Sequence, residues 1–306
     1  MATLVGQRLG AYLLVAEIGR GSMGVVYQAQ HTGTGQTAAV KVLLESLTED
    51  QSFVTRFTRE ARIVKALQHA NIVRLYDTGH DTGHLYFAME YFAGQTAGQI
   101  LKQRGRMDVG SVVEIAAQAA DALHYAHTYG HIVHRDIKPE NLLVDRWCRV
   151  KVLDFGLARI EGVQSITKAG TVVGSLYYVS VEQLLGRPID GRADVYSLGV
   201  SMYEMLTGRR PYRGRTLNEM TEAIISGKAP APSQLEPSVP PALDAIIYRA
   251  MERDLARRYA SAEELRQDLR ALQAQLAAPP AAPPAAPSGG GPSEPPHTPD
   301  ARNAAR

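Results

Sequence analysis

The segment HRDIKPEN, residues 134–141, places many charged or titratable side chains close together, as a catalytic loop could. Five of its eight side chains are charged or titratable: His134, Arg135, Asp136, Lys138 and Glu140. It follows a helix-like stretch and precedes the short β-like run LLV. A solvated helix face would spread such charges at helical spacing. Their clustering between two elements instead indicates functional groups held on a rigid scaffold.

Three glycines near the N-terminus, Gly19, Gly21 and Gly24, form a G-x-G-x-x-G pattern that could hold phosphate. Without side chains, backbone N–H groups can approach phosphate oxygens closely. The pattern alone is weak, because dinucleotide-binding folds share it and a tight hairpin would also use glycines. Here the residues that follow, VVYQAQ, continue as a strand rather than opening a helix. This favours a hairpin that covers phosphates.

Lys41 lies within the apolar β-like run AAVKVLL, where its ammonium group needs a partner or an anionic ligand. Taken alone, a lysine reaching water from an edge strand is the commoner interpretation. In the following helical pattern Glu60 falls on the apolar stripe of Phe53, Phe57, Val64 and Leu67. An ion pair between Lys41 and Glu60 would explain both charges, and we predict it.

Asp154 ends a second apolar β-like run and is followed by Phe155 and Gly156. A carboxylate at a strand end suits a Mg²⁺ ion that bridges phosphates, and Asn141 could supply a second oxygen. The alternative is an aspartate that merely begins a turn.

The elements around these residues change from strands to helices near residue 92. Strand patterns cover 11–19, 24–31, 37–44, 72–79 and 85–92, and helix patterns cover about 50–68, 111–130, 193–208 and a last helix opened by a Ser261–Glu264 capping box. Gly208 should end the third helix. This predicts a β-rich small lobe joined to a mainly helical large lobe.

Composition limits the other classes of function. A net charge of +2 gives no basis for a nucleic-acid or membrane-surface partner. Cys148 is the single cysteine, which excludes an internal disulfide and favours a reducing cytoplasm. No apolar run is long enough to span a membrane. Residues 278–306 are rich in Pro, Ala, Gly and Ser, and we expect them to be a disordered, linker-like tail.

Taken together, these motifs resemble the eukaryotic-type protein kinases, and among them the bacterial serine/threonine kinases. The matching segments occur in the family's order: GRGSMGVV, AVK, the helix with Glu60, HRDIKPEN, DFG, SVE, DVYSLG and RDLARRY. The resemblance implies an α+β, two-lobed kinase domain over 11–277, with lobes of about 11–92 and 93–277. It implies transfer of the ATP γ-phosphate to Ser/Thr hydroxyls of proteins, with Mg²⁺ or Mn²⁺.

The resemblance also assigns roles in catalysis. Asp136 would be the catalytic base, and Lys138 would stabilise the transferring phosphoryl group. Asn141 and Asp154 would hold the metal, while Lys41, positioned by Glu60, would hold the α- and β-phosphates. Residues placed around adenine are Val26, Ala39, Leu143, the gatekeeper Met89 and the backbone at Glu90 and Phe92. His134 is expected to pack with Val64, Leu75 and Phe155.

Regulation is implied by Arg135, which in the family contacts a phosphate on the activation segment, here 154–182. Among Ser165, Thr167 and Thr171, the two threonines are the predicted autophosphorylation sites, although ordinary surface threonines remain an alternative. The resemblance also implies that the small lobes of two copies could pair, since such pairing is common in the family. If the tail is a shortened linker, the domain could be tethered to a membrane.

Two departures from the family pattern stand out. Ser175 replaces a threonine but keeps the hydroxyl that would contact Asp136 and Lys138. The usual Ala-Pro-Glu reads Ser180-Val181-Glu182, which should loosen the backbone locally, while Glu182 is expected to pair with Arg258. The rival functions are a pseudokinase scaffold and a small-molecule kinase. The first would lack one of Lys41, Asp136, Asn141 and Asp154, and the second would lack the activation segment.

Overall fold

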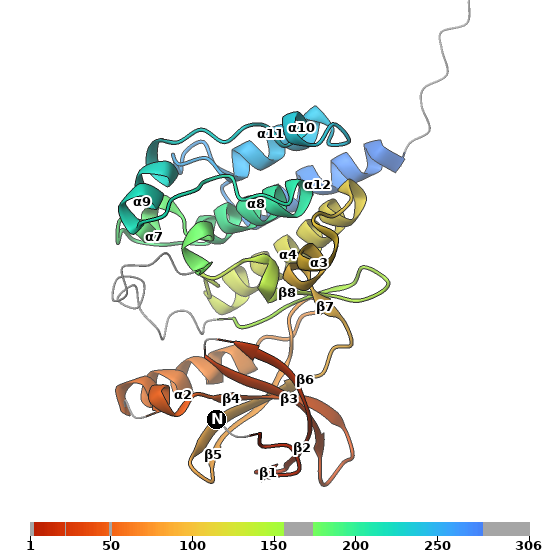
Figure 1. Cartoon of the computed structure of the whole chain (residues 1–306), viewed down its shortest axis with the longest axis vertical. Coiled ribbons are helices and arrows are strands. Elements are labelled where there is room, and N and C mark those ends of the chain that lie inside the picture. The colour runs from red at the N-terminus through yellow and green to blue at the C-terminus, as the bar shows by residue number, and fades with distance from the viewer. Residues whose placement is uncertain (1–2, 22, 49–50, 156–173, 278–306) are drawn as a thin grey trace, which may run out of the picture.

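A computed structural model describes residues 3–21, 23–48, 51–155 and 174–277 of the chain. They form two lobes, an antiparallel sheet with α2 beside it and a larger group of helices (Figure 1). The short strands β7, β8 and β9 lie on the side of the helical lobe that faces the sheet (Figure 1). This is the two-lobed α+β arrangement that the sequence predicts.

The small-lobe sheet has six strands in the order β1-β2-β3-β4-β6-β5. Their bounds are β1 (Arg8–Leu9), β2 (Tyr12–Gly21), β3 (Gly24–His31), β4 (Thr37–Leu43), β5 (Leu75–Asp81) and β6 (His84–Glu90). All of the pairings are antiparallel, as hairpin connections require. The strand predicted over 72–79 begins three residues later than expected.

The N-terminal residues extend the fold beyond the predicted start at residue 11. Strand β1 pairs with β2, and Leu4 and Leu9 are buried in an apolar cluster with Tyr12, Tyr27 and Tyr86. The sequence analysis missed this short segment because two paired residues give no periodic pattern.

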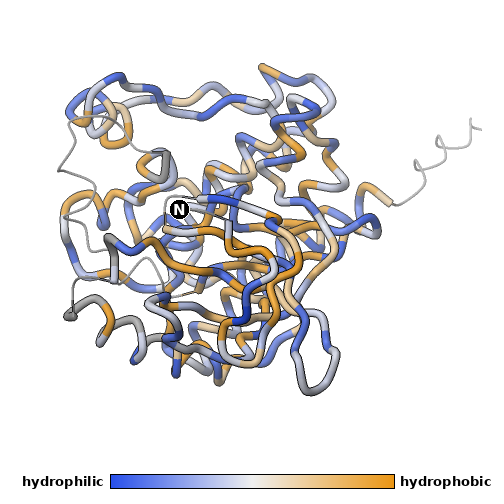
Figure 2. The backbone as a smooth tube through the Cα atoms, turned by 60° about the horizontal axis from the view of Figure 1, so that its bottom comes forward, coloured by the Kyte–Doolittle hydropathy of each residue, from blue (hydrophilic) through white to orange (hydrophobic). Residues whose placement is uncertain are grey.

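The helix predicted over about 50–68 is α2 (Gln51–Lys65), preceded by a single helical turn, α1 (Glu45–Thr48), that was not predicted. A second apolar cluster contains residues from β4, β5 and β6 together with Ala61 and Val64 of α2. Both faces of the sheet are thus covered with apolar contacts, and apolar residues recur along its strands (Figure 2).

The large lobe is built around α4 and α8, which belong to one apolar cluster. Its elements are β7 (Gln95–Thr96), α3 (Ala97–Arg104), α4 (Val109–Gly130), β8 (Leu142–Val144), β9 (Val150–Val152), α7 (Val181–Leu184), α8 (Arg192–Thr207), α9 (Leu217–Ser226), α10 (Pro232–Leu235), α11 (Pro241–Ala250) and α12 (Ala262–Ala277), with 3₁₀ turns at Pro139–Asn141 and Gly174–Tyr178. None of the helices in these described ranges is both long and apolar enough to cross a membrane.

Helix ends follow the sequence signals with one difference. Gly208 ends α8 in the left-handed region at φ 65°, as predicted. At α12 the Glu264 amide donates to Ser261 Oγ at 3.3 Å, which is half of the predicted capping box. The Glu264 carboxylate, however, accepts from the Ala260 amide rather than from Ser261. The return bond therefore reaches one residue further than a capping box requires.

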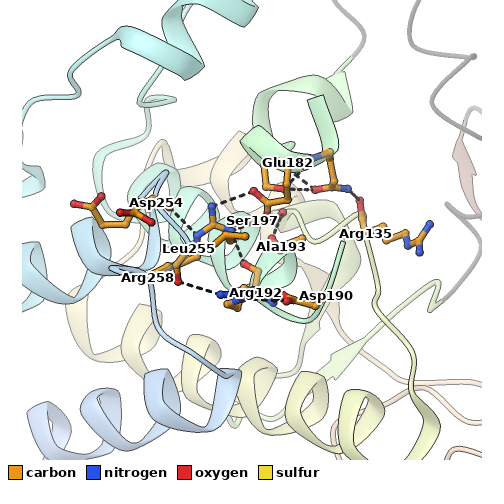
Figure 3. A network of polar contacts seen from close by, with 12 residues as sticks. Arg135, Glu182, Asp190, Arg192, Ala193, Ser197, Asp254, Leu255 and Arg258 are labelled. Atoms are coloured by element: carbon orange, nitrogen blue, oxygen red, sulfur yellow. Dashed lines mark hydrogen bonds and ion pairs between the residues drawn. The ribbon is translucent and has the colours of Figure 1, made fainter. Parts of the chain in front are cut away.

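A buried ion pair joins α7 to the segment before α12. Arg258 donates to both carboxylate oxygens of Glu182, at 2.7 and 3.2 Å, and to the Arg192 carbonyl (Figure 3). It also donates to the Glu252 carbonyl. The Arg258 side chain is fully buried and that of Glu182 is 5% exposed. The pair that the family resemblance implied is therefore present, with its remaining polar atoms bonded as burial demands.

We predict that Arg258→Met lowers the free energy of unfolding by about 3–5 kcal/mol, because it leaves the Glu182 carboxylate buried without its cation. Chemical denaturation measures this change. The control is Arg266→Met, which breaks the more exposed pairs with Glu263 and Asp121 and should cost less than about 1 kcal/mol. Equal losses in the two variants would contradict the structural role of the buried pair.

Candidate active site

In the predicted catalytic loop, Lys138 and Asn141 both contact Asp136. Lys138 Nζ donates to Asp136 Oδ2 at 2.7 Å. Asn141 Nδ2 donates to the Asp136 carbonyl at 2.7 Å and to Asp136 Oδ2 at 3.1 Å. Two donors therefore hold the same carboxylate oxygen, Oδ2 of Asp136, which is the arrangement expected of a positioned base.

A buried carboxylate holds the start of this loop. Asp194, in the first turn of α8, accepts the backbone N–H of His134 and that of Arg135, both at 2.7 Å. Gln183 Nε2 donates to the Arg135 carbonyl at 3.1 Å. Arg135 has φ 70°, a conformation that non-glycine residues rarely adopt, and these bonds to Asp194 and Gln183 fix it.

Asp194 is the functional residue whose role the sequence analysis missed. Its side chain is buried, and burial raises the pKa of the carboxyl group despite the two amide hydrogen bonds and the nearby charges of His134 and Arg135. The sequence motif DVYSLG contains Asp194, but an acidic residue in the first turn of a helix is usually explained by the helix dipole. Its hydrogen bonds reach residues about 60 positions away, and no pattern in the neighbouring sequence predicts such contacts.

The next segment, around Leu153 to Phe155, is tied to the same loop. His134 Nε2 lies 2.6 Å from the Leu153 carbonyl, and the Leu153 amide donates to the Asn141 carbonyl at 2.9 Å. The His134 ring lies 4.6 Å from that of Phe155. Phe155 in turn lines a cavity of about 40 Å³ with Val64 and Leu75. The four residues predicted to stack are therefore brought into one region.

Lys41 and Asp154 connect the two lobes. Lys41, on β4 of the small lobe, is 8% exposed, and its Nζ donates to Asp154 Oδ2 at 2.7 Å. Asp154 adopts φ 57°, which turns the chain after β9. The sequence analysis named both residues but did not predict their contact. The side chain of Glu60 lies outside the described part of the structure, so the Lys41–Glu60 pair stays a prediction.

These contacts make one continuous polar site. Lys41 contacts Asp154, the neighbouring Leu153 is bonded to Asn141, and Asn141 is bonded to Asp136. Residues far apart in the sequence thereby line a single region between the lobes. A cation, a base and two oxygen donors in one place suit a polyanionic substrate.

The residues at this site fit a Mg²⁺ ion. Asn141 uses its amide nitrogen toward Asp136, which leaves its Oδ1 available as an oxygen donor, and Asp154 supplies a carboxylate. No group of three His, Cys, Asp or Glu side chains that could bind a metal occurs in the described ranges. Magnesium does not require one, since it is commonly held by one or two side chains together with substrate phosphates.

The three glycines of the hairpin between β2 and β3 have different surroundings. A Cβ on Gly24 would lie 2.0 Å from the Val42 carbonyl oxygen, so packing alone explains that glycine. A Cβ on Gly21 would meet nothing within 4 Å, and one on Gly19 would have ordinary contact with Val26. Protein packing does not account for Gly21, whereas the approach of a phosphate would.

Four of the residues that the family resemblance places around adenine belong to one apolar cluster of the small lobe. Ala39 and Met89 are buried, and Val26 and Leu143 pack against the same cluster. Phe92 is half-buried in the segment that joins the lobes. The Glu90 amide already donates to the Arg74 carbonyl at 2.8 Å, and the Glu90 carboxylate accepts from Lys151 at 2.7 Å.

Three predicted residues of the activation segment are not placed. Thr167 and Thr171 lie outside the described residues, as does the side chain of Ser175, whose backbone belongs to the 3₁₀ turn Gly174–Tyr178. Arg135 points its guanidinium away from the Glu182–Arg258 pair (Figure 3).

The segment that replaces Ala-Pro-Glu has a local cap. Ser180 caps α7 through a capping box with Gln183, in which the Ser180 amide donates to Gln183 Oε1 at 3.1 Å. Ser180 is fully buried and Val181 nearly so. The expected loosening of this backbone is therefore opposed by the cap and by the packing of the valine side chain.

Comparison with known proteins identifies the family. Residues 12–269 match the model of the protein kinase domain. The chain belongs to the protein kinase family.

Its curated relatives are bacterial serine/threonine kinases. A probable serine/threonine-protein kinase of Clostridium acetobutylicum is 41% identical over 258 residues, which are 84% of this chain and 39% of that protein. Serine/threonine-protein kinase PrkC of Bacillus subtilis is 35% identical over 268 residues, 87% of this chain and 41% of that protein. The chain thus spans about two fifths of the length of these relatives.

A solved structure shares the fold. The crystal structure of the Mycobacterium tuberculosis PknI kinase domain superposes with a TM-score of 0.70 at 30% identity, covering 89% of this chain and 99% of that one. The predicted two-lobed kinase fold is confirmed.

Two alanine substitutions separate the roles of the glycines. We predict that Gly21→Ala leaves stability within about 0.5 kcal/mol of wild type, because its Cβ meets open space. It should raise the KM for ATP about tenfold through loss of one charge-assisted phosphate contact. Gly24→Ala should instead destabilise the fold by about 1–3 kcal/mol. Thermal unfolding and initial rates measure both. An unchanged KM in Gly21→Ala would contradict phosphate binding by this hairpin.

Proposed function

We propose that this chain is a serine/threonine protein kinase that transfers the γ-phosphate of ATP to hydroxyl groups of proteins, with Mg²⁺ or Mn²⁺. The observation that carries the proposal is the continuous site formed by Lys41, Asp154, Asn141, Asp136 and Lys138. The curated relatives, which are serine/threonine kinases by name, support the same reaction.

The chemistry follows from positions and charges. Asp136 accepts a hydrogen bond from the substrate hydroxyl and orients its oxygen toward the γ-phosphorus. Lys138, 2.7 Å from Asp136, neutralises charge on the transferring group, and Lys41 binds the α- and β-phosphates. Asn141 and Asp154 would hold the metal, which supplies charge neutralisation between the phosphates when bound. Phosphoryl transfer depends on such positioning more than on covalent participation of the protein.

The pseudokinase alternative is disfavoured by the residues present. Lys41, Asp136, Asn141 and Asp154 are all retained, and hydrogen bonds from Lys138 and Asn141 orient Asp136. A scaffold would have no need of an oriented carboxylate beside a lysine.

A protein substrate is favoured over a small molecule by a cavity beside the catalytic loop. It measures about 250 Å³ and is lined by Pro139 and Glu140 of the loop, Lys102 of α3, and Tyr178 and Glu204. Such a hollow next to the base can take a side chain that flanks the phosphorylated residue in a peptide.

A γ-phosphate transfer assay tests the activity. With a generic basic protein as substrate, Asp136→Asn should reduce the rate by about 10²–10⁴-fold while leaving stability nearly unchanged, because the amide keeps the shape but not the base. Absence of phosphate on any protein with the wild-type chain would favour the scaffold. Transfer to a small metabolite alone would favour the second alternative.

We also propose activation by autophosphorylation at Thr167 or Thr171. Arg135 is held in the catalytic loop, next to Asp136, where it can pair with a phosphate on the activation segment. Action in the cytoplasm, where ATP is available and Cys148 stays reduced, is consistent with this reaction. Pairing of small lobes between copies stays a prediction.

The double substitution Thr167→Ala/Thr171→Ala should lower activity about 10–100-fold, the equivalent of one or two lost charge-assisted hydrogen bonds. Phosphopeptide mapping of the active wild-type protein should find phosphate on at least one of the two threonines. Full activity of the double variant, with neither site modified in the wild type, would refute the proposal. Ser165→Ala is the matched control in the same segment.

A further inference from the structure

The turn between β8 and β9 presents an exposed aromatic ring together with two cations. Trp147 is 62% exposed. The guanidinium carbon of Arg146 lies 3.9 Å from the centre of the indole ring, and that of Arg149 lies 5.0 Å from it. We call these three residues the Trp147 surface. It is separate from the catalytic site, and no part of the proposed mechanism uses it.

Hydrogen bonds to Asp145 hold the backbone of this turn in place. Asp145 Oδ1 accepts the backbone N–H of Trp147 and that of Arg149, both at 2.9 Å, and Asp145 Oδ2 accepts from Arg149 Nε at 2.7 Å. The Asp145 side chain is 2% exposed. The indole thus offers apolar area to solvent beside two cations, and a partner that combines apolar groups with carboxylates would match this surface.

The end of α12 lies close to this turn. Gln118 Nε2 donates to the Cys148 carbonyl at 2.8 Å and to Glu114 Oε1 at 2.6 Å. Glu114 Oε2 accepts from Gln273 Nε2 at 2.8 Å, and α12 ends one turn later at Ala277. Two side chains of α4 therefore bridge the turn and the last part of α12, so the chain that follows Ala277 starts near the Trp147 surface.

The chain that follows has matching chemistry. Residues 292–300, PSEPPHTPD, contain four prolines and the two acidic residues Glu294 and Asp300. Proline-rich segments favour the extended polyproline conformation and bind to exposed aromatic rings at low entropic cost. The carboxylates complement Arg146 and Arg149. Residues 278–291 separate this segment from α12, and at ~3.1 Å per residue they can span up to about 40 Å.

We propose that residues 292–300 of this chain bind to the Trp147 surface of the same molecule. The prolines pack on the exposed indole, and Glu294 and Asp300 pair with the two arginines. This contact would hold the proline-rich tail against the large lobe on the β8–β9 turn.

Trp147 is the only tryptophan in the sequence, so intrinsic fluorescence reports directly on this surface. We expect the acrylamide quenching constant of the wild-type chain to be about twofold lower than that of Glu294→Gln/Asp300→Asn, because the bound segment shields the ring. Pro295→Ala/Pro296→Ala should raise the constant in the same direction. The control Ala282→Lys/Ala286→Lys makes the same change in net charge elsewhere in the tail and should leave the constant at the wild-type value.

Equal quenching constants in the wild type and in both segment variants would overturn the proposal. Shielding that grows with protein concentration would also overturn it, because the occupant would then be a second copy of the chain. All the substitutions lie outside the kinase domain, so a loss of shielding cannot come from unfolding, and the readout does not depend on catalytic activity.

Discussion

The ion pair between Lys41 and Asp154 defines where the two lobes meet. Lys41 belongs to a strand of the small lobe and Asp154 to the segment after β9 in the large lobe, and their 2.7 Å contact closes the site between them. A nearly buried ammonium group needs an anion nearby, and the same requirement makes this position suitable for the phosphates of a nucleotide. The contacts around the site keep Lys41, Asp154 and Asp136 in one region.

The large lobe supplies that positioning through buried polar contacts. Asp194 fixes the backbone of the catalytic loop, and Gln183 of α7 bonds to the same loop at the Arg135 carbonyl. The Glu182–Arg258 pair anchors α7 to the rest of the lobe. A chain of contacts thus runs from the C-terminal part of the lobe to the backbone of the catalytic loop, next to Asp136. Arg135 and Asp154 both have positive φ, and such conformations persist where the surrounding structure fixes them.

The sequence predicts the lobes and most elements, because motif spacing and periodicity are local properties. It also names Lys41, Asp136, Asn141 and Asp154, which the structure brings into one region. Strand β1 and helix α1 escape prediction since they are too short for any period. The Asp194 contacts and the Lys41–Asp154 pair escape it because they join residues 59 to 113 positions apart. The predicted capping box at Ser261 is present in one of its two hydrogen bonds, because the Glu264 carboxylate accepts from the Ala260 amide instead of the Ser261 amide. Contacts between residues distant in the sequence, rather than local secondary-structure propensity, determine these features of the site.

Binding of MgATP measured by calorimetry tests the shared site most directly. The account predicts that Lys41→Met and Asp154→Asn each weaken MgATP binding about tenfold or more, since each loses a charged contact to the phosphates or metal. Asp136→Asn should bind MgATP nearly as well as wild type, because the proposed partner of Asp136 is the hydroxyl substrate rather than the nucleotide. If Lys41→Met and Asp154→Asn bind MgATP as tightly as wild type, these residues do not line one nucleotide site and the account is wrong.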